Sequence, residues 1–437
     1  MKPFSISADH VWDGSAFREG WSIDVTSDGR IGRAGPADGP VDRHHDRCAL
    51  VPGFVNAHSH AFQVLLRGAV EQYGPDSRSN FWSWRDRMYE TVGRLEPDSV
   101  FDASLQCFTE MVRGGWTTVG EFHYVRHAGD SDLWALDDAV IQAAMQSGIR
   151  IVLLQACYLA GDVDQPLAPE QSRFDSGSVD RHLEQHESLA QRYDSDLVEF
   201  ALAAHSVRAV GLDDLLELAR ASEYFDRPLH IHLEENLAEI ESCLRVHGKT
   251  PMRLLIDNEL VTPRMTAVHC THSHPVDLAD FAAAGGRICL CPMTEGNLAD
   301  GIVDMKTIVE HGIPVCAGSD MNLRQDPFEE VRWIEYVQRL ASLGRGVFTQ
   351  SDRSHGACLL QVGTCNGAAS LAVEAGDFNP GSWADMLILD IDGYGPGPGQ
   401  LLEDSIVTGC GPERIVSTII GGRVVHDRPG VGREPAS

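Results

Sequence analysis

The stretch Val51–His60, with the sequence VPGFVNAHSH, decides the fold that we expect for this chain. It is an apolar segment that ends in two histidines separated by one residue. Residues two apart on a strand point to the same side of the sheet, so His58 and His60 can bind one metal ion at the strand's carboxyl end. A His-x-His pair by itself is a weak signal, because a metal site also needs third and fourth ligands at plausible spacing.

Eight short apolar segments, of which this is the first, alternate with helix-forming stretches such as 212–225, 235–256 and 329–343. Regular alternation of strands and helices indicates a parallel sheet, because parallel strands need long crossover connections. Eight such units predict a (β/α)8 TIM barrel over residues 51–374, with its main insertion at 68–97. The eight strands are expected to end near Ala57, Phe122, Ala156, Ala204, His232, His269, Cys291 and Gly318.

Short strand-like segments broken by Gly, Asp and Pro occupy both ends of the chain. Examples are residues 21–25 near the N-terminus and 384–390 near the C-terminus. Residues 415–425 are typical of a hairpin that turns at two adjacent glycines. We therefore expect residues 1–50 and 375–437 to form one small composite β-sandwich domain beside the barrel.

The composition excludes some classes of partner. With 64 acidic and 35 basic residues the net charge is −29, and so acidic a chain repels nucleic acid and anionic membranes. The chain has no run of 18 apolar residues, and its first residues lack the basic flank and apolar core of a signal peptide, so we expect a cytoplasmic protein. Eleven cysteines without a Cys-x-x-Cys pair are expected to be buried free thiols.

Polar residues follow most of the predicted strands, and chemistry in a (β/α)8 barrel takes place at the carboxyl ends of its strands. Solvated loops explain one or two such residues, but not polar residues at most of the strand ends. These residues are His58 and His60 after the first strand, Glu121 to Tyr124 after the second, His205 to Arg208 after the fourth, His230 to Glu235 after the fifth, His269 after the sixth and Asp320 after the eighth.

Four of these residues form a candidate metal site, namely His58, His60, His232 and Asp320. Three nitrogens and one oxygen suit a single divalent ion, Zn²⁺ or alternatively Fe²⁺, and leave a position open for water. Such an ion lowers the pKa of the bound water and makes hydroxide available near neutral pH. The competing interpretation of Asp320 is a helix N-cap, a common role for an Asp after a strand.

Three residues are candidates for the catalytic work itself. Glu235 can carry a proton to a leaving nitrogen, His269 can polarise the electrophile, and Asp320 can accept the proton of the water. His230 competes with His232 as the metal ligand. We favour His232 because its spacing to Glu235 places both side chains beyond the end of the strand.

The chain resembles the metal-dependent amidohydrolase superfamily. The resemblance rests on His-x-His after the first strand, His after the fifth and sixth, Asp after the eighth, and the segment 379–385 that returns to a small β domain. Some members hold two metals bridged by a carboxylated lysine near the third or fourth strand. None of the three lysines, Lys2, Lys249 and Lys306, lies there, so the resemblance implies one metal, as in the deaminase branch. It also implies a homodimer, which is common among relatives.

Several motifs are similar to those of the formimidoylglutamate deiminase family of histidine degradation. They are HSHAFQ (58–63), FWSWR (81–85), MY (88–89), EFHY (121–124), TEGNL (294–298) and RWIEY (332–336). That family hydrolyses the small molecule N-formimidoyl-L-glutamate to N-formyl-L-glutamate and ammonia. The resemblance carries the metal and catalytic roles onto the residues named above. It carries substrate binding onto Gln63, Arg85, Tyr124, His205 and Arg208.

The chemistry of the arginines agrees with this substrate, because a guanidinium forms bidentate pairs with carboxylates and glutamate carries two of them. Met293, Met321 and the segment 322–327 depart from the family pattern. We expect these positions to rim the pocket mouth. The alternatives are the same chemistry on another formimidoyl or guanidino acid, or on an aminated heterocycle, and a non-enzymatic scaffold with the same fold.

Overall fold

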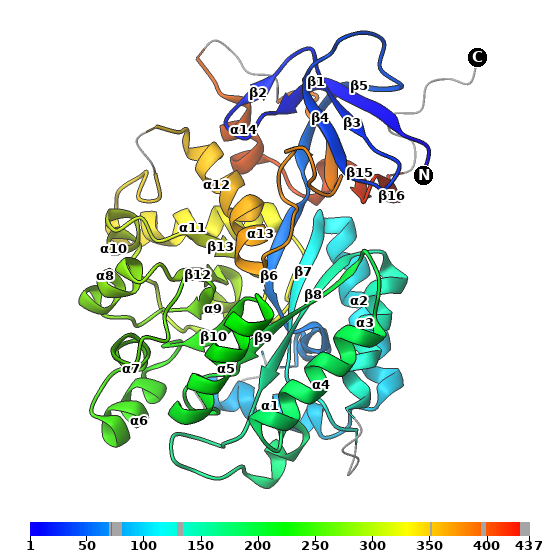
Figure 1. Cartoon of the computed structure of the whole chain (residues 1–437). Coiled ribbons are helices and arrows are strands. Elements are labelled where there is room, and N and C mark those ends of the chain that lie inside the picture. Colours follow the sequence, from blue (N-terminus) through cyan, green and yellow to red (C-terminus); the bar gives the residue numbers. More distant parts are fainter. Residues whose placement is uncertain (70, 72–80, 129–133, 350–351, 395–398, 429–437) are drawn as a thin grey trace.

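The structure is a computed structural model that describes residues 1–69, 71, 81–128, 134–349, 352–394 and 399–428. Part of the predicted 68–97 insertion lies outside these residues. Within them, eight parallel strands pair in sequence order and form a nearly closed barrel surrounded by helices, which confirms the predicted fold (Figure 1). The strands are β6 (Phe54–Ser59), β7 (Trp116–His123), β8 (Arg150–Cys157), β9 (Val198–Ala204), β10 (Leu229–Leu233), β11 (Met265–His269), β12 (Arg287–Leu290) and β13 (Val315–Ala317).

The helices follow the strands at the positions that the sequence pattern indicates, and α5 has the predicted bounds. The α-helices are α1 (Phe81–Val92), α2 (Pro97–Gly114), α3 (Ala135–Ser147), α4 (Val179–Arg192), α5 (Leu212–Phe225), α6 (Leu237–His247), α7 (Pro251–Asp257), α8 (Pro275–Ala283), α9 (Pro292–Leu298), α10 (Met305–Glu310), α11 (Pro327–Ser342), α12 (His355–Gly363), α13 (Cys365–Leu371) and α14 (Leu402–Gly409). Short 3-10 helices are η1 (Ala61–Leu66), η2 (Pro169–Phe174) and η3 (Pro412–Arg414).

One helical prediction is wrong, because the stretch 235–256 forms two helices, α6 and α7. Gly248 ends α6 with φ +69°, a left-handed conformation that glycine adopts without strain. Thr250 then caps α7 by accepting a hydrogen bond from the Arg253 backbone N–H, and Pro251 opens the helix. These local stop and start signals outweigh the continuous helical pattern.

The two ends of the chain build a second, mixed sheet, which confirms the expected composite β domain (Figure 1). Its order is β16-β15-β14-β5-β1-β3-β4, with β2 paired to β1. The strands are β1 (Phe4–Trp12), β2 (Phe17–Arg18), β3 (Trp21–Val25), β4 (Ile31–Pro36), β5 (Arg43–Pro52), β14 (Met386–Asp390), β15 (Ile415–Ile420) and β16 (Arg423–Asp427). Strand β5 leads directly into β6, so the chain passes from the second sheet into the barrel without a loop. The residue boundaries of the two domains stay a prediction.

The seam between the first and last barrel strands is closed by backbone bonds at the predicted metal site. The Asp320 N–H donates to the His58 carbonyl oxygen at 3.0 Å, and the His60 N–H donates to the Asp320 carbonyl oxygen at 3.0 Å. Residues 58–60 and 320 therefore lie side by side although they are far apart in the sequence. Closing the barrel thus brings together predicted metal ligands that follow its first and last strands.

A buried ion pair joins the barrel to the second sheet. Arg150, at the start of β8, donates from Nε and Nη2 to the Asp385 carboxylate oxygens at 3.0 and 3.2 Å, and both side chains are fully buried. The Gly421 N–H also donates to this carboxylate. The pair therefore ties β8 to the segment that enters β14.

Replacing Asp385 with Ala is expected to lower the free energy of unfolding by about 3–5 kcal/mol, because it leaves the buried Arg150 guanidinium unpaired. Urea denaturation measures the change. The exposed pair of Lys306 and Glu310, 3.8 Å apart, provides the control, and Lys306→Ala is expected to cost less than about 1 kcal/mol. Equal effects of the two substitutions would contradict the structural role of the buried pair.

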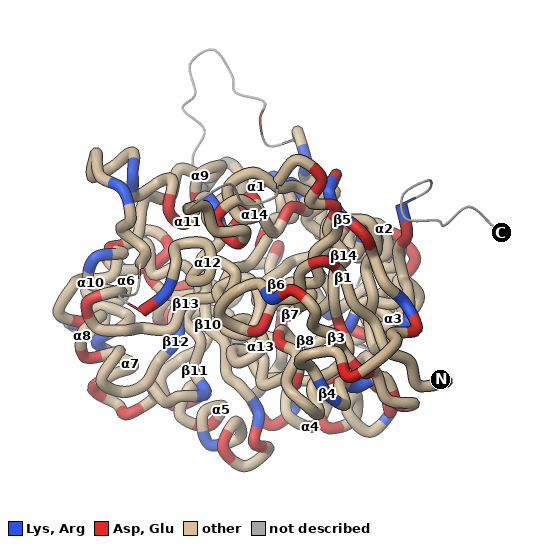
Figure 2. Tube along the Cα trace, turned by 90° about the horizontal axis from the view of Figure 1, so that it is seen from above, with Lys and Arg blue, Asp and Glu red and all other residues tan. Residues whose placement is uncertain are grey.

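Charges and thiols follow the expectations from composition. Figure 2 shows Asp and Glu distributed along the trace and interspersed with Arg and Lys, so the acidic charge is not gathered in one stretch. All eleven cysteines are free, and all but the half-buried Cys365 are buried. Among the described residues, no helix combines the length and the apolar character that crossing a membrane requires.

Candidate active site

The four predicted metal ligands meet in one buried cluster at the carboxyl end of the barrel. The potential ligand atoms of His58, His60, His232 and Asp320 all lie within 4.8 Å of one another. Asp320 Oδ1 is 3.3 Å from His58 Nε2 and 3.2 Å from His60 Nε2, and His58 Nε2 is 3.1 Å from His232 Nε2. Neighbouring ligands of a tetrahedral ion with bonds of about 2.0–2.1 Å lie about 3.3–3.4 Å apart, so these side chains fit such an ion.

The protonation of the histidines also suits metal binding. His60 Nδ1 lies 2.7 Å from the Phe122 carbonyl oxygen and His232 Nδ1 lies 2.9 Å from the His205 carbonyl oxygen. A carbonyl only accepts, so Nδ1 carries the proton and Nε2 presents a lone pair to the cluster. Burial lowers the pKa of His58 to about 3 and the pKa of His232 well below its ordinary value, which keeps both rings neutral.

Asp320 supplies the negative charge of the cluster. Burial favours the neutral acid, but the His58 and His60 rings beside the carboxylate outweigh it and hold the pKa of Asp320 well below its usual range. The helix N-cap interpretation is wrong, because residues 321–326 are not helical and α11 is capped by Asp326. Asp320 therefore faces the histidines as an ionised carboxylate.

The structure brings His232, and not His230, to the cluster. His230 is fully buried, and its Nε2 lies 2.8 Å from the Ser370 carbonyl oxygen of α13. Both histidines belong to β10, but two positions on a strand are about 6.5 Å apart, so the deeper His230 does not reach the ligand atoms.

The three lysines lie away from the cluster, so none of them can form a carboxylated-lysine bridge between two metals there. Lys249 pairs with Asp257 at 2.7 Å, Lys306 lies on α10, and Lys2 precedes β1. Cys291 and His269 also come near Asp320, and burial raises the pKa of the Cys291 thiol well above its ordinary value. The donor set therefore fits one ion.

The two further catalytic candidates stand beside the cluster. Glu235 Oε1 is 3.7 Å from His269 Nε2, which in turn is 4.0 Å from Asp320 Oδ2. Burial raises the pKa of the Glu235 carboxyl above its ordinary value. Burial favours a neutral His269, but the neighbouring carboxylates of Glu235 and Glu295 outweigh it and raise the pKa of its ring. This arrangement can hold and transfer protons next to a reacting carbon.

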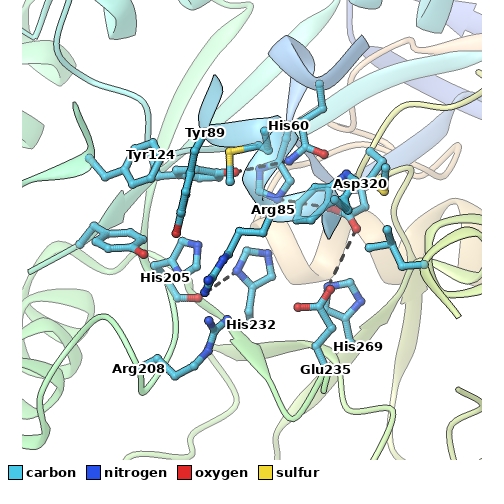
Figure 3. A pocket seen from close by; sticks show the side chains of 17 residues that line it. His60, Arg85, Tyr89, Tyr124, His205, Arg208, His232, Glu235, His269 and Asp320 are labelled. Atoms are coloured by element: carbon cyan, nitrogen blue, oxygen red, sulfur yellow. Dashed lines mark hydrogen bonds and ion pairs between the residues drawn. The ribbon is translucent and has the colours of Figure 1, made fainter. Parts of the chain in front are cut away.

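All five predicted substrate-binding residues line one pocket above the cluster (Figure 3). They are Gln63, Arg85, Tyr124, His205 and Arg208. Helix α1 contributes Arg85 and the loop after β9 contributes Arg208, so two guanidinium groups reach the same cavity from different elements. Aromatic side chains complete the wall, namely Trp84, Tyr89, Tyr158 and Phe174. Their contact with substrate stays a prediction.

Comparison with known proteins places this architecture in a family. A model of the amidohydrolase family matches residues 49–425. Formimidoylglutamate deiminase from Pseudomonas aeruginosa is 33% identical over 95% of this chain and 94% of its own length. The chain belongs to the amidohydrolase family. It is an enzyme that hydrolyses carbon–nitrogen bonds, which argues against the scaffold alternative.

Other relatives of this amidohydrolase have different substrates in their names. The 5'-deoxyadenosine deaminase from Methanothermobacter thermautotrophicus is 26% identical over 78% of this chain and 73% of its own length. The crystal structure of an amidohydrolase from Brucella melitensis superposes with a TM-score of 0.88 at 28% identity, covering 97% of this chain and 96% of that one. The fold is therefore shared across members that act on different compounds.

Glu295 is a further contact of the amidohydrolase site, and no role was predicted for it. Its Oε1 lies 3.4 Å from His269 Nδ1 and accepts a hydrogen bond from the Cys291 N–H at 2.9 Å. It thereby orients the ring of His269 so that Nε2 faces Asp320. Glu295 stands within the TEGNL motif, but the contact with His269 depends on packing between α9 and β11, which the motif does not reveal.

Of the positions that we expected at the pocket mouth, Met321 alone is among the lining residues. Met321 lines the pocket and is buried, as expected. Met293 is not among the lining residues, and its backbone N–H donates to Glu330. Asn322 is also turned inward, and its side chain donates to Ser59 Oγ at 3.1 Å. The segment after β13 thus supports the β6–β13 seam, and the expectation that it rims the mouth is wrong beyond Met321.

Proposed function

We propose that this amidohydrolase is a mononuclear metal-dependent deiminase that converts N-formimidoyl-L-glutamate and water to N-formyl-L-glutamate and ammonia, a step of histidine degradation. The observation that carries the proposal is that Arg85 and Arg208 line the same pocket as the buried His₃Asp cluster. Guanidinium groups recognise carboxylates, and the substrate carries two. The name of the Pseudomonas relative supports the same choice.

The four ligands would hold a divalent ion, for which we expect Zn²⁺ with Fe²⁺ as the alternative. When bound, such an ion lowers the pKa of water and provides the nucleophile at neutral pH. Asp320 accepts a proton from the attacking water, and His269 stabilises charge as the formimidoyl carbon becomes tetrahedral. Glu235 gives a proton to the terminal nitrogen. Asp320 passes the proton that it took from water to the same nitrogen, so the C–N bond breaks and ammonia leaves. The remaining hydroxyl returns a proton to Glu235 as the carbonyl of the formyl group forms.

Arg208→Met is expected to lower kcat/KM for N-formimidoyl-L-glutamate about 10- to 100-fold, chiefly through KM, because a charge-assisted hydrogen bond is worth about 1.5–3 kcal/mol. Steady-state ammonia release measures the change. Arg208 also lies 3.8 Å from the buried Glu239, so Arg85→Met, which leaves that pair intact, serves as a parallel variant. The exposed Arg220→Met on α5 is the control. An unchanged kcat/KM in both Arg208→Met and Arg85→Met would contradict the assignment of these arginines to the substrate carboxylates.

A second candidate reaction is deamination of an adenosine derivative. It is favoured by the names of further relatives and by the aromatic wall, on which a heterocycle can stack. A neutral heterocycle does not need two arginines. Ammonia release from 5'-deoxyadenosine that exceeds the release from N-formimidoyl-L-glutamate would favour this second reaction.

We also propose that the enzyme is a homodimer, and that residues 1–50 with 375–437 and residues 51–374 are its two domains. Light scattering coupled to size exclusion measures the mass of the assembly against the 47.8 kDa of one chain. A mass near that of one chain would contradict the dimer.

A further inference from the structure

Helix α1 forms one wall of the pocket without belonging to the barrel. Four of its residues line the cavity, namely Trp84, Arg85, Met88 and Tyr89. Figure 3 shows the Arg85 and Tyr89 side chains pointing into the pocket, toward the side where His205 and Arg208 lie. The Arg85 guanidinium carbon lies 5.5 Å from the centre of the Tyr89 ring. The placement of α1 therefore decides where a carboxylate meets Arg85.

Gln171, in the loop between β8 and α4, holds α1 from behind the pocket. Its side chain is buried and does not line the cavity. The two N–H groups of its Nε2 are shared among three acceptors, the Tyr158 hydroxyl at 2.9 Å, the Tyr89 hydroxyl at 3.2 Å and the Gly161 carbonyl oxygen at 3.3 Å. Its Oε1 accepts from the Ala168 N–H at 2.8 Å. One amide thus links the barrel rim to α1, and both its nitrogen and its oxygen form hydrogen bonds.

Two neighbours of Gln171 on η2 also contact α1 or the residues just after it. Arg173 donates from Nη2 to the Gly93 carbonyl at 2.9 Å and from Nη1 to the Leu95 carbonyl, so it holds the chain just beyond the end of α1. The Phe174 ring lies 5.9 Å from the Tyr89 ring and 5.2 Å from the Tyr158 ring. Three residues of η2 therefore fix both the inner face and the C-terminal end of α1.

The loop around Gln171 is closely packed. A Cβ at Gly161 would lie 2.5 Å from the Pro166 carbonyl oxygen and 2.7 Å from Gln171 Oε1, closer than real Cβ contacts. The Tyr158 N–H donates to Ser176 Oγ at 3.0 Å, and the Ser176 N–H donates to the Tyr158 carbonyl at 2.9 Å, which closes the loop onto β8. The loop is therefore held to the end of β8 on the side from which Gln171 contacts α1.

We propose that Gln171 is a positioning residue, which sets the place of Tyr89 and, through helix α1, of Arg85 in the pocket. Gln171 itself does not touch the cavity, so its effect reaches the substrate through α1. We call this placement of α1 by Gln171 the clamp, and it is inferred from the hydrogen bonds and ring contacts alone. Its consequence for substrate affinity rests on the proposed function, in which Arg85 binds a carboxylate of N-formimidoyl-L-glutamate.

The direct test is hydrogen–deuterium exchange of α1 in the full-length metal-loaded protein, without substrate. Gln171→Leu is expected to raise exchange of residues 84–92 about 5- to 10-fold, because it removes the hydrogen bond that holds the Tyr89 hydroxyl. Exchange in β6 to β13 is expected to stay unchanged. Gln106→Leu, the same substitution at an exposed site of α2, is the control. Unchanged exchange in α1, or an equal rise throughout the barrel, would overturn the clamp.

The kinetic consequence is a split between KM and kcat. Gln171→Leu is expected to raise KM for N-formimidoyl-L-glutamate about 3- to 10-fold, with kcat within about twofold, since the metal and catalytic side chains stay in place. Equal losses in both constants would show damage to the catalytic side chains and overturn the positioning role. If the wild-type enzyme releases no ammonia from this substrate, the proposed function fails, whereas the exchange experiment still decides the clamp.

Two further variants keep the test decisive if Gln171→Leu does not fold. Gly161→Ala displaces the Gln171 amide without altering a lining residue, and Tyr89→Phe removes the hydroxyl at the other end of the same bond. Each is expected to raise exchange of α1 as Gln171→Leu does. The double variant Gln171→Leu/Tyr89→Phe is expected to exceed neither single variant by more than about twofold, because interacting sites are not additive. Additive effects would contradict the coupling between the two residues.

Discussion

Asp320→Asn is expected to lower kcat/KM for ammonia release by about 10³-fold or more. The carboxylate of Asp320 is both a predicted ligand and the expected acceptor of the water proton, and an amide performs neither task well. The two side chains have nearly the same shape, so the β6–β13 seam, which uses the backbone of residue 320, is expected to remain closed. Initial rates at saturating and limiting substrate measure the loss.

The control for this variant is Asp326→Asn, six residues further along the chain. Asp326 caps α11 through the Glu329 N–H, a role that Asn also performs, and it lies outside the pocket. Its activity is expected to remain within about twofold of wild type. Metal analysis of both variants separates loss of the ion from loss of the proton acceptor. More than a tenth of wild-type activity in Asp320→Asn would contradict the site.

Glu235→Gln is expected to lower kcat by about 10²–10⁴-fold, the usual contribution of a general acid or base. Burial raises the pKa of this carboxyl, so the protonated form, which is the form that can give a proton to a leaving nitrogen, persists to higher pH than in an exposed Glu. Glu235 is not a ligand of the cluster, so the variant is expected to keep its metal. Steady-state kinetics and metal analysis of the same preparation measure both.

Glu241→Gln, an exposed position on α6, provides the matched control and is expected to leave kcat within about twofold. The pair of variants differs only in whether the carboxyl faces His269. If Glu235→Gln retained more than about a tenth of kcat, proton delivery would have to come from another group.

The placement of the His₃Asp cluster follows from simple rules of strand geometry. His58 and His60 share a face because side chains repeat every two residues on a strand, and parallel strands carry their polar residues to one end of the barrel. Asp320 joins them because the last strand of a closed barrel lies beside the first. These rules need only apolar periodicity and the position of polar residues, both of which a sequence contains.

How deep a side chain lies in the barrel, and which distant segments contact each other, could not be predicted with certainty from the sequence. His230 and His232 have the same periodicity, and the sequence favoured His232 only through its spacing to Glu235. The structure shows that height along β10 separates the buried His230 from the cluster. Glu295 and Gln171 act through side-chain packing across loops that no local pattern specifies. The break between α6 and α7 could have been predicted from the sequence, because Gly248 and Pro251 are helix stop and start signals.

The most direct test of the account is ammonia release from N-formimidoyl-L-glutamate by protein that carries about one divalent metal per chain. The account predicts rapid release of one ammonia per substrate, with N-formyl-L-glutamate as the other product, and loss of both in Asp320→Asn. No release from metal-loaded, folded protein would contradict the proposed substrate.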